Sequence, residues 1–326
     1  MKRILTGLQP SGQITLGNYL GAIKQMATIQ NEYESFLFVA DLHAITVPQN
    51  PDELRANVRS LVGIYLACGV DPAKNIIYVQ SDNIYHPALS WILECHTPYG
   101  ELGRMTQFKD KSKRHESFMA GLLTYPVLMA ADIILYDADY VPVGEDQTQH
   151  VEFARDLAGR FNNRYGRIFV IPEAKIPENA ARIMDLQDPD KKMSKSAENA
   201  NGVVYLLDDN DTIAKKFKRA VTDSDGEIRF DPENKAGISN LLTIASGLSG
   251  ISIEEAEAQY AGMPYGKFKN ELADLAVSTI GPIRAKYDEI QKSNEIDTVL
   301  NRGRDITVEM ARKKYEEVAR LVGLSR

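Results

Sequence analysis

Two short segments carry residue types that suit phosphate binding. The first, residues 7–12 (Gly-Leu-Gln-Pro-Ser-Gly), is a turn between a predicted strand and a predicted helix, where an open α/β sheet binds its ligands. Its glycines have the spacing of a phosphate loop, but Gln13-Ile14 stands where that motif requires lysine and serine or threonine. The Walker interpretation therefore fails. Gly17-Asn18 then offers helix N-terminal N–H groups to a phosphate, although a strand-to-helix turn needs glycines in any case.

The second segment is Lys192-Met193-Ser194-Lys195-Ser196, which lies in a polar stretch rich in Asp, Asn and Lys. Two ammonium groups three residues apart, with hydroxyls between and beside them, suit a polyphosphate. Held on a loop, they could close over it as negative charge develops. A solvated charged linker would have the same composition, and the pattern alone does not exclude it.

A third set of residues, Tyr125, Met129 and Asp132, is spaced by four and three positions. A continuous helix would place all three on one face. If Pro126 kinks or begins that helix, only Met129 and Asp132 share a face. An aspartate in an apolar helix needs a hydrogen-bond donor, because an unpaired buried carboxylate is costly. A surface position, or an internal hydroxyl partner, is the alternative.

The elements that must position these residues alternate between strand and helix in the first half of the chain. Apolar runs predict strands at residues 4–5, 36–40, 76–79, 140–143 and 168–171, and helical spacing predicts helices from residue 17, over 54–68 and over 116–135. This alternation indicates a doubly wound, parallel α/β sheet.

Beyond about residue 190 the pattern becomes helical. Apolar spacing predicts helices over 238–245, 268–283 and 308–322, and Ser252 with Glu255 forms a capping box that begins another. We therefore expect two domains: a Rossmann-like catalytic domain over 1–190, and a helical domain over 191–326 that includes the lysine segment.

Composition limits the class of protein. The chain has 326 residues, 44% hydrophobic and 25% charged, as in ordinary soluble globular proteins. The net charge of −7 argues against a protein that coats nucleic acid, but local basic groups could contact a specific RNA. Two such groups stand out: Arg104, Lys109, Lys111, Lys113 and Arg114, and Lys215, Lys216, Lys218 and Arg219. Solvated helix faces are the alternative for both.

Cysteine usage and hydropathy suggest a cytoplasmic location. Cys68 and Cys95 match no metal-ligand spacing, and both lie in apolar stretches typical of buried thiols. No apolar run approaches the length of about 20 residues that spans a bilayer, and the N-terminus does not have the pattern of a signal peptide. We expect neither a membrane nor DNA as a partner, and no metal held by a dedicated protein site.

The two phosphate-type segments together resemble the paired signatures of class I aminoacyl-tRNA synthetases. The first signature, Thr15-Leu16-Gly17-Asn18, is usually His-Ile-Gly-His; here Thr15 and Asn18 replace both histidines, which matches the tryptophanyl branch of the family. The resemblance covers essentially the whole chain. It extends through residues 7–12, 121–126 (Gly-Leu-Leu-Thr-Tyr-Pro), 129–133 (Met-Ala-Ala-Asp-Ile) and 144–147 (Gly-Glu-Asp-Gln).

This resemblance implies roles in ATP binding. The phosphate and ribose site would be lined by Gln9, Pro10, Ser11, Gly17 and Asn18. Gly144, Glu145 and Asp146 would hold the ribose, and the backbone of Ile183 the adenine. Residues Lys192 to Ser196 would form a mobile loop on the leaving pyrophosphate, with Lys192 and Lys195 as its charged members. Because Thr15 and Asn18 are not histidines, we assign them positioning rather than proton transfer.

The resemblance also implies an amino-acid pocket. Asp132 would accept the indole N–H of tryptophan, Tyr125 and Gln147 would hold its ammonium group, and Met129, Val141 and Val143 would pack on the ring. His43 follows a predicted strand and either lines this pocket or is structural. Trp91, the one tryptophan, lies in an apolar helix and is expected in the core or at a subunit interface.

The implied activity is a two-step ligation by a homodimer. ATP, with Mg²⁺ bound mainly through its phosphates, would activate L-tryptophan to the adenylate, and tRNA(Trp) would take the acyl group. The alternatives are a tyrosyl-tRNA synthetase, an α/β nucleotidyltransferase of small-molecule metabolism, and a non-catalytic RNA-binding relative. A nucleotidyltransferase of that kind would share the first loop but would not need the helical second domain.

Overall fold

The computed structural model describes residues 1–106, 108–109, 119–144, 147–176, 182–195 and 199–324. Its centre is a five-stranded parallel sheet in the order β3-β2-β1-β4-β5. The strands are β1 Arg3–Leu8, β2 Glu34–Val39, β3 Asn75–Val79, β4 Tyr140–Pro142 and β5 Glu173–Lys175. The order reverses next to β1, and ligands of such sheets bind at the carboxyl ends around that point. The predicted doubly wound α/β sheet is confirmed.

One predicted strand, residues 168–171, is wrong. That segment is a loop, and the fifth strand is β5, a few residues later. The Asn162 side chain accepts hydrogen bonds from the N–H groups of Ile168 and Phe169 and donates to the Phe169 carbonyl. These bonds satisfy the backbone groups that a strand would have offered to its neighbour.

Alternate residues of each strand pack on opposite faces of the sheet. On one face Leu37 and Val39 of β2 join a core with α4 (Pro51–Ala67), and on the other Phe36 and Phe38 join a core with α5 (Tyr85–Glu94), α8 (Ala120–Ile134) and α9 (Thr148–Tyr165). This period of two is the geometry of a strand buried on both sides. The first core also includes residues of the second half of the chain, from Ile183 to Val299.

Short elements connect these helices and strands. After β1 the chain forms α1 (Leu16–Asn18), the π-helix η1 (Tyr19–Ile23) and α2 (Lys24–Ile29). The others are α3 (Asp41–Ala44), the 3₁₀ turns η2 (Gln80–Asp82) and η4 (Ala200–Gly202), and α6 (Tyr99–Leu102).

The second half is helical, as expected. It contains α10 (Asn210–Lys218), α11 (Ala236–Ser249), α12 (Ile253–Tyr260), α13 (Tyr265–Gln291) and α14 (Glu295–Leu321). The predicted capping box of Ser252 and Glu255 is present at the start of α12. The pair Gly281-Pro282 lies inside the single helix α13.

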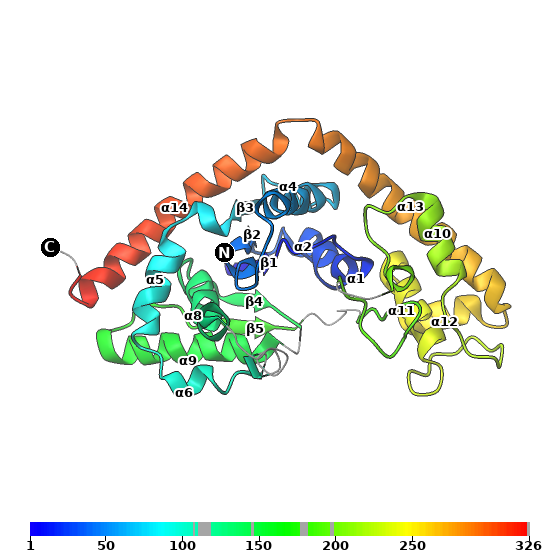
Figure 1. Cartoon of the computed structure of the whole chain (residues 1–326), viewed down its shortest axis with the longest axis horizontal. Helices are drawn as coiled ribbons and strands as arrows, with labels where there is room; N and C mark the ends of the chain where they lie inside the picture. The colour runs from blue at the N-terminus through cyan, green and yellow to red at the C-terminus, as the bar shows by residue number, and fades with distance from the viewer. Residues whose placement is uncertain (107, 110–118, 145–146, 177–181, 196–198, 325–326) are drawn as a thin grey trace.

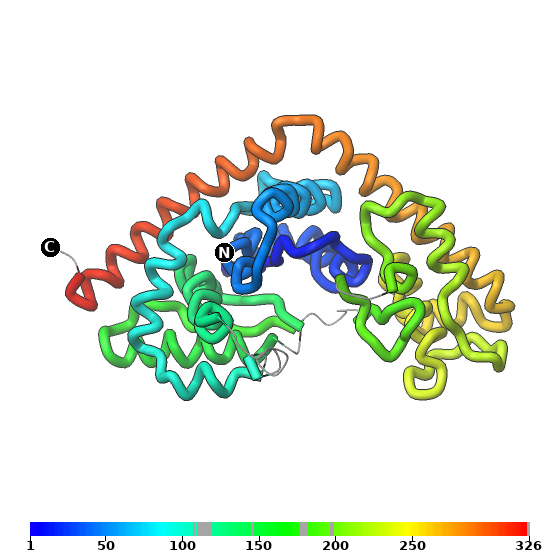
Figure 2. Tube along the Cα trace, in the orientation of Figure 1, coloured from blue at the N-terminus to red at the C-terminus, as the bar shows by residue number. Residues whose placement is uncertain are grey.

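Helices α13 and α14 form an arch over the molecule, with α13 above the helical half and α14 against the sheet half (Figures 1 and 2). Gly303 of α14 lies so close to β3 that an added Cβ would be 1.8 Å from the Ile77 carbonyl oxygen. Only glycine allows this approach. At the other end of α14, Lys314 pairs with Asp137 at 2.7 Å.

Two expectations from apolar patterning are corrected by the structure. Cys95 is exposed and Cys68 is half-buried. Trp91 is 67% exposed, so it does not belong to the core. Trp91 lies in α5 and Cys95 is its C-terminal cap, about one turn further on, and both are exposed.

Among the described residues, no single helix has the length and apolar composition to cross a membrane. The bent pair of α11 and α12, which meet at 109°, passes that test by length and composition only.

Candidate active-site cleft

A cleft of about 1700 Å³ lies at the carboxyl ends of the strands. One wall is formed by residues that follow the strands, including Gln9, His43 and Gly144. The opposite wall comes from the helical half and includes Phe230 and Asn240. The two halves of the chain therefore enclose the position where a sheet of this order binds its ligand.

The three residues spaced along the predicted helix lie on one face of a continuous α8. The helix runs from Ala120 to Ile134 with Pro126 inside it, and Tyr125, Met129 and Asp132 all line the cleft. Four other residues expected in the amino-acid pocket line the same cleft: His43, Val141, Val143 and Gln147.

Asp132 is fully buried and already has three hydrogen-bond partners. Oδ1 accepts from Gln80 Nε2 at 2.8 Å and lies 2.6 Å from His86 Nδ1, and Oδ2 lies 2.8 Å from His43 Nε2. The prediction that this aspartate needs hydrogen-bond donors is confirmed, and the alternatives of a surface position and of an internal hydroxyl partner are wrong, because its donors are one amide and two histidine rings. Sequence reasoning missed Gln80 and His86; their one signal is that both closely follow the strand at 75–79.

These partners determine the ionisation of Asp132. Burial by itself raises the pKa of the carboxyl, but hydrogen bonds from His43 and His86 outweigh that cost and hold the pKa below its usual value. A carboxylate offers about four acceptor positions, and the three donors named above fill three of them. Asp132 is thus a buried anion with capacity for one further donor at the edge of the cleft.

Tyr125 is paired with a second buried histidine that the sequence did not reveal. Its hydroxyl lies 2.8 Å from Nε2 of His150 on α9, and its ring packs edge-on against His43. Burial raises the pKa of Tyr125 to about 12, so the hydroxyl keeps its proton at neutral pH. Gln147 is the residue before α9, one turn from His150.

Thr15 and Asn18 cap α1 reciprocally. The Thr15 hydroxyl accepts from the Asn18 N–H at 3.2 Å, and the Asn18 side-chain oxygen accepts from the Thr15 N–H at 3.2 Å. Thr15 is also buried. Side chains used in this way fix the shape of the turn, which agrees with a positioning role.

The two signature segments meet in space. An added Cβ at Gly17 would lie 3.6 Å from Ile183 Cβ and 3.8 Å from Met193 Cβ. Met193 is buried, and its N–H donates to the Ile183 carbonyl at 3.0 Å. Residues 183–193 therefore place the start of the lysine segment next to the first signature, residues 15–18.

Lys195 is the more buried of the two signature lysines. Burial lowers its pKa to about 8, whereas Lys192 is exposed. Of the other expected ATP-site residues, Gln9 and Gly144 are exposed in the cleft, Ser11 and Ser194 are half-buried, and Pro10 is buried. Glu145, Asp146 and Ser196 lie outside the described residues.

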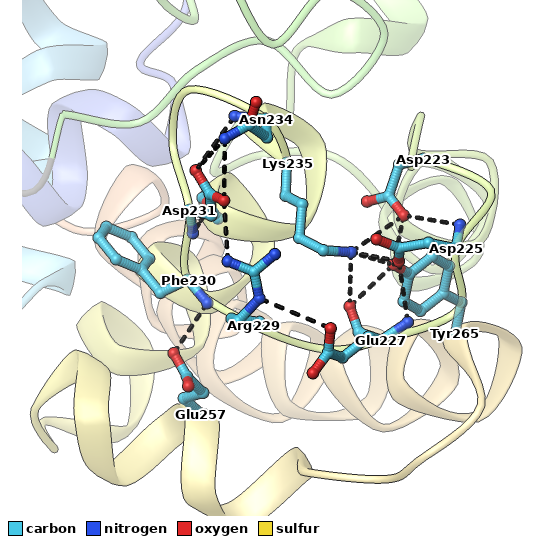
Figure 3. Close-up of polar contacts among 11 residues, drawn as sticks. Asp223, Asp225, Glu227, Arg229, Phe230, Asp231, Asn234, Lys235, Glu257 and Tyr265 are labelled. Atoms are coloured by element: carbon cyan, nitrogen blue, oxygen red, sulfur yellow. Dashed lines mark hydrogen bonds and ion pairs between the residues drawn. The ribbon is translucent and has the colours of Figure 1, made fainter.

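The loop that supplies the opposite wall is held by a buried lysine which sequence reasoning missed. Lys235 Nζ contacts Asp223 Oδ1 at 3.1 Å, the Glu227 carbonyl at 2.9 Å and an oxygen of Asp225 (Figure 3). Tyr265 of α13 bonds the same group of oxygens. Desolvation lowers the pKa of Lys235, but these acceptors more than offset it and hold the pKa above its usual value.

The basic group on α10 is only partly a surface feature. Lys215, Lys218 and Arg219 are exposed, but Lys216 is buried and pairs with Asp208 at 2.7 Å. Including Lys216 in an RNA-binding face was therefore wrong, because its charge is already paired inside the fold. Of the other basic group, Arg104 and Lys109 are described; Lys111, Lys113 and Arg114 lie outside the described residues.

Comparison with known proteins agrees with this arrangement. The family described as class I tRNA synthetases for tryptophan and tyrosine matches residues 1–280 of the chain. The chain belongs to this family. The parallel sheet, the cleft and the meeting of the two signatures are therefore those of a class I aminoacyl-tRNA synthetase.

Three individual relatives with high similarity are named as enzymes specific for tryptophan. A tryptophan–tRNA ligase of Halalkalibacterium halodurans is 53% identical, over 100% of this chain and 98% of that protein. The solved tryptophanyl-tRNA synthetase of Mycoplasma pneumoniae is 39% identical with a TM-score of 0.92, over 100% of this chain and 98% of the other. That of Campylobacter jejuni, complexed with ADP and tryptophan, is 38% identical with a TM-score of 0.84, over 99% of this chain and 100% of the other.

Proposed function

We propose that this synthetase activates L-tryptophan with ATP and transfers it to tRNA(Trp). The observation that supports this most directly is the ionised carboxylate of Asp132, which lies at the wall of a cleft shared with the phosphate-type loop. The relatives described above carry the same activity in their names.

Asp132 would recognise the indole. The indole N–H would be the fourth donor to the carboxylate, and Met129, Val141 and Val143 would pack on the ring. Phenylalanine offers no donor at that position, and the tyrosine hydroxyl lies at a different distance. The Tyr125 hydroxyl and Gln147 would hold the ammonium group.

Catalysis of the first step would depend on position and charge. The tryptophan carboxylate attacks the α-phosphorus of ATP, the bond to the pyrophosphate breaks, and the adenylate forms. Lys195 and Lys192 would stabilise the charge that grows on the leaving pyrophosphate. Thr15 and Asn18 shape the turn, so that the N–H groups near Gly17 face the phosphates.

The remaining ATP contacts follow the family. Gln9, Pro10, Ser11 and Asn18 would line the phosphates and ribose, and Gly144, Glu145 and Asp146 the ribose. The adenine would contact the backbone of Ile183 and Met193, and Ser194 and Ser196 would complete the loop.

Mg²⁺ would enter with ATP. Within the described residues, no group of three or more His, Cys, Asp or Glu side chains could hold a metal ion. We expect the ion to be bound through the phosphates, where it neutralises the charge of the leaving group. No step requires a protein side chain as its ligand.

Transfer of the aminoacyl group to tRNA and formation of a dimer would both use the outer surface of the protein. The helices of residues 191–326 would bind the tRNA anticodon, with Lys215, Lys218 and Arg219 as candidate phosphate contacts. A homodimer would bury the exposed apolar residues Ile84 and Trp91, which are seven positions apart at the start of and within α5, so that helical spacing places them on one side of the helix. We expect the enzyme in the cytoplasm.

The decisive experiment is exchange of labelled pyrophosphate into ATP in the presence of each amino acid. Exchange that depends on tryptophan alone supports the proposal. Tyrosine-dependent exchange would indicate a tyrosyl enzyme, exchange without an amino acid a different nucleotidyltransferase, and no exchange a non-catalytic relative.

A second experiment tests Asp132. The measurement is the ratio of specificity constants for tryptophan and for an analogue with sulfur in place of the indole N–H. A site built around a hydrogen bond can reject such analogues by about 10⁴–10⁵. Asp132→Ala should reduce the ratio sharply; an unchanged ratio would show that Asp132 does not contact the indole nitrogen.

A further inference from the structure

A buried chain of hydrogen bonds leads from the C-terminal helix to Asp132. Asn83 Nδ2 donates to the Thr307 carbonyl of α14 at 3.2 Å and to the Tyr136 hydroxyl at 3.0 Å. The Tyr136 hydroxyl lies 2.8 Å from His86 Nε2, and His86 Nδ1 lies 2.6 Å from Asp132 Oδ1. All of these side chains are buried.

The chemistry of the groups fixes the direction of this chain. An ionised carboxylate only accepts hydrogen bonds, so His86 Nδ1 carries a hydrogen. In the neutral imidazole Nε2 is then an acceptor, which takes the hydroxyl hydrogen of Tyr136. The Tyr136 oxygen in turn accepts from the Asn83 amide. The bonds from Asn83 to Tyr136, from Tyr136 to His86 and from His86 to Asp132 thus all point toward Asp132, and each polarises the next. The bond from Asn83 to the Thr307 carbonyl points the other way and anchors the chain on α14.

The elements that carry the chain hold it rigidly. Tyr136 stacks on Phe36 of β2 with ring centroids 5.2 Å apart. The Asn83 side-chain oxygen accepts from the Tyr85 N–H at the start of α5. His86 lies in the first turn of α5, is not itself a cleft-lining residue, and hydrogen-bonds Asp132, which does line the cleft. It can therefore act on a substrate only through Asp132.

We propose that His86 is a positioning residue for amino-acid selection, which orients the Asp132 carboxylate so that its remaining acceptor position faces a substrate ring N–H. His43 and Gln80 bond the same carboxylate. His43 itself lines the cleft, whereas His86 is not among the residues that line it. This inference rests on the proposed function, because it concerns how the tryptophan site achieves its specificity.

Three variants distinguish a positioning role of His86 from a role in packing alone. His86→Leu removes both ring hydrogen bonds. His86→Asn keeps a donor close to the position of Nδ1 and loses the contact with Tyr136. Tyr136→Phe leaves His86 in place but removes the hydroxyl that bonds its Nε2.

His96→Leu is the matched control. His96 is also a histidine whose Nε2 lies against a tyrosine hydroxyl, that of Tyr165 at 3.0 Å, but its Nδ1 bonds the Ile92 carbonyl rather than an aspartate. Its replacement loses the same type of pair without touching Asp132.

The measurements are KM for tryptophan and for ATP in pyrophosphate exchange, and the specificity ratio between tryptophan and its sulfur analogue. His86→Leu should raise KM for tryptophan by about 10- to 100-fold, the range for one hydrogen bond to a charged group, and should reduce the ratio while KM for ATP stays unchanged. His86→Asn should recover much of the ratio, and Tyr136→Phe should shift it less, in the same direction.

The inference is wrong if folded His86→Leu protein keeps the wild-type specificity ratio. It is also wrong if His86→Leu raises KM for tryptophan and for ATP equally, because that result would indicate a general effect on the fold. His96→Leu shows how large such a general effect is. If His86→Leu does not fold, unchanged ratios in both His86→Asn and Tyr136→Phe overturn the inference equally. Absence of tryptophan-dependent exchange in the wild type would defeat the proposed function itself. Normal wild-type exchange with unchanged variant ratios defeats only the role of His86.

Discussion

The side chain of Lys195 covers Gly12. An added Cβ at Gly12 would lie 3.8 Å from Lys195 Cβ and 3.9 Å from its Cδ, and Gly12 has a φ of +64°. A positive φ favours glycine, so Gly12 can adopt the conformation that the turn requires. Because Gly12 has no side chain, it also leaves room for the aliphatic part of Lys195. The second signature therefore lies beside the first loop.

Lys195→Ala should reduce the rate of adenylate formation by about 10²–10³, as removal of one donor to transition-state charge typically does. Tryptophan affinity should barely change, because the ammonium acts on the pyrophosphate. Single-turnover adenylate formation and tryptophan binding are the measurements. The control is Lys191→Ala, an exposed lysine paired with Asp188 in the same segment. Near-normal rates in Lys195→Ala would refute the role.

The pH dependence of ATP use should reflect the same lysine. Burial lowers the pKa of Lys195 to about 8, and the ammonium, the form present below that pH, is the one that attracts phosphate. The specificity constant for ATP should therefore fall as pH rises through about 8. In Lys195→Arg the guanidinium stays charged, so the fall should disappear. A wild-type profile that is flat to pH 9.5 would contradict this expectation.

Replacement of Lys215 and Lys218 by alanine should weaken aminoacylation of tRNA and make its salt dependence shallower, by about 0.7–0.9 logarithmic units per lost phosphate contact. Pyrophosphate exchange should be spared, because neither side chain lines the cleft. Lys216→Ala should instead lower thermal stability, since it leaves Asp208 without its buried partner. Equal losses of exchange and aminoacylation in the double variant would assign these lysines to the fold.

Lys235→Met should lower the midpoint of thermal unfolding, because it leaves Asp223 and Asp225 without the cation that holds the 223–235 loop. Removing one partner of a buried ion pair costs more than the pair contributes. Lys267→Met is the control, since Lys267 is exposed and pairs with Glu271 on the surface of α13. Equal midpoints for the two variants would show that the Lys235 cluster does not stabilise the loop.

Trp91→Lys should convert a dimer to monomers. A charge at this exposed apolar position would be desolvated in an interface, and unpaired buried charges are costly. Sedimentation velocity of the wild type and of the variant is the measurement, with Leu324→Lys, an exposed leucine near the C-terminus, as the control. A wild type that sediments as a monomer would overturn the proposed homodimer.

The parallel sheet and most of the helices could be predicted from sequence, because period and capping are local properties. The spacing of Tyr125, Met129 and Asp132 indicated one helix face, and the structure confirms that face. The segment 168–171 was misassigned because its backbone partners come from the Asn162 side chain, and an apolar run does not reveal such a partner.

The candidate site was predictable only where local residues define it. The two signatures could be recognised in the chain, but their contact through Gly17, Ile183 and Met193 depends on how the two halves pack. The burial of Lys216 and the exposure of Trp91 likewise depend on which neighbours cover each helix face. An apolar or charged pattern does not carry that information.

The sequence by itself determined that Asp132 stands in an apolar helix, where a carboxylate requires donors. Only the tertiary structure decided which donors these are. Gln80, His86 and His43 come from segments that lie far from α8 in the chain and converge because parallel strands end at the same edge of the sheet. The ionisation of a buried carboxylate is set by such neighbours in space, since burial alone would have favoured its neutral form.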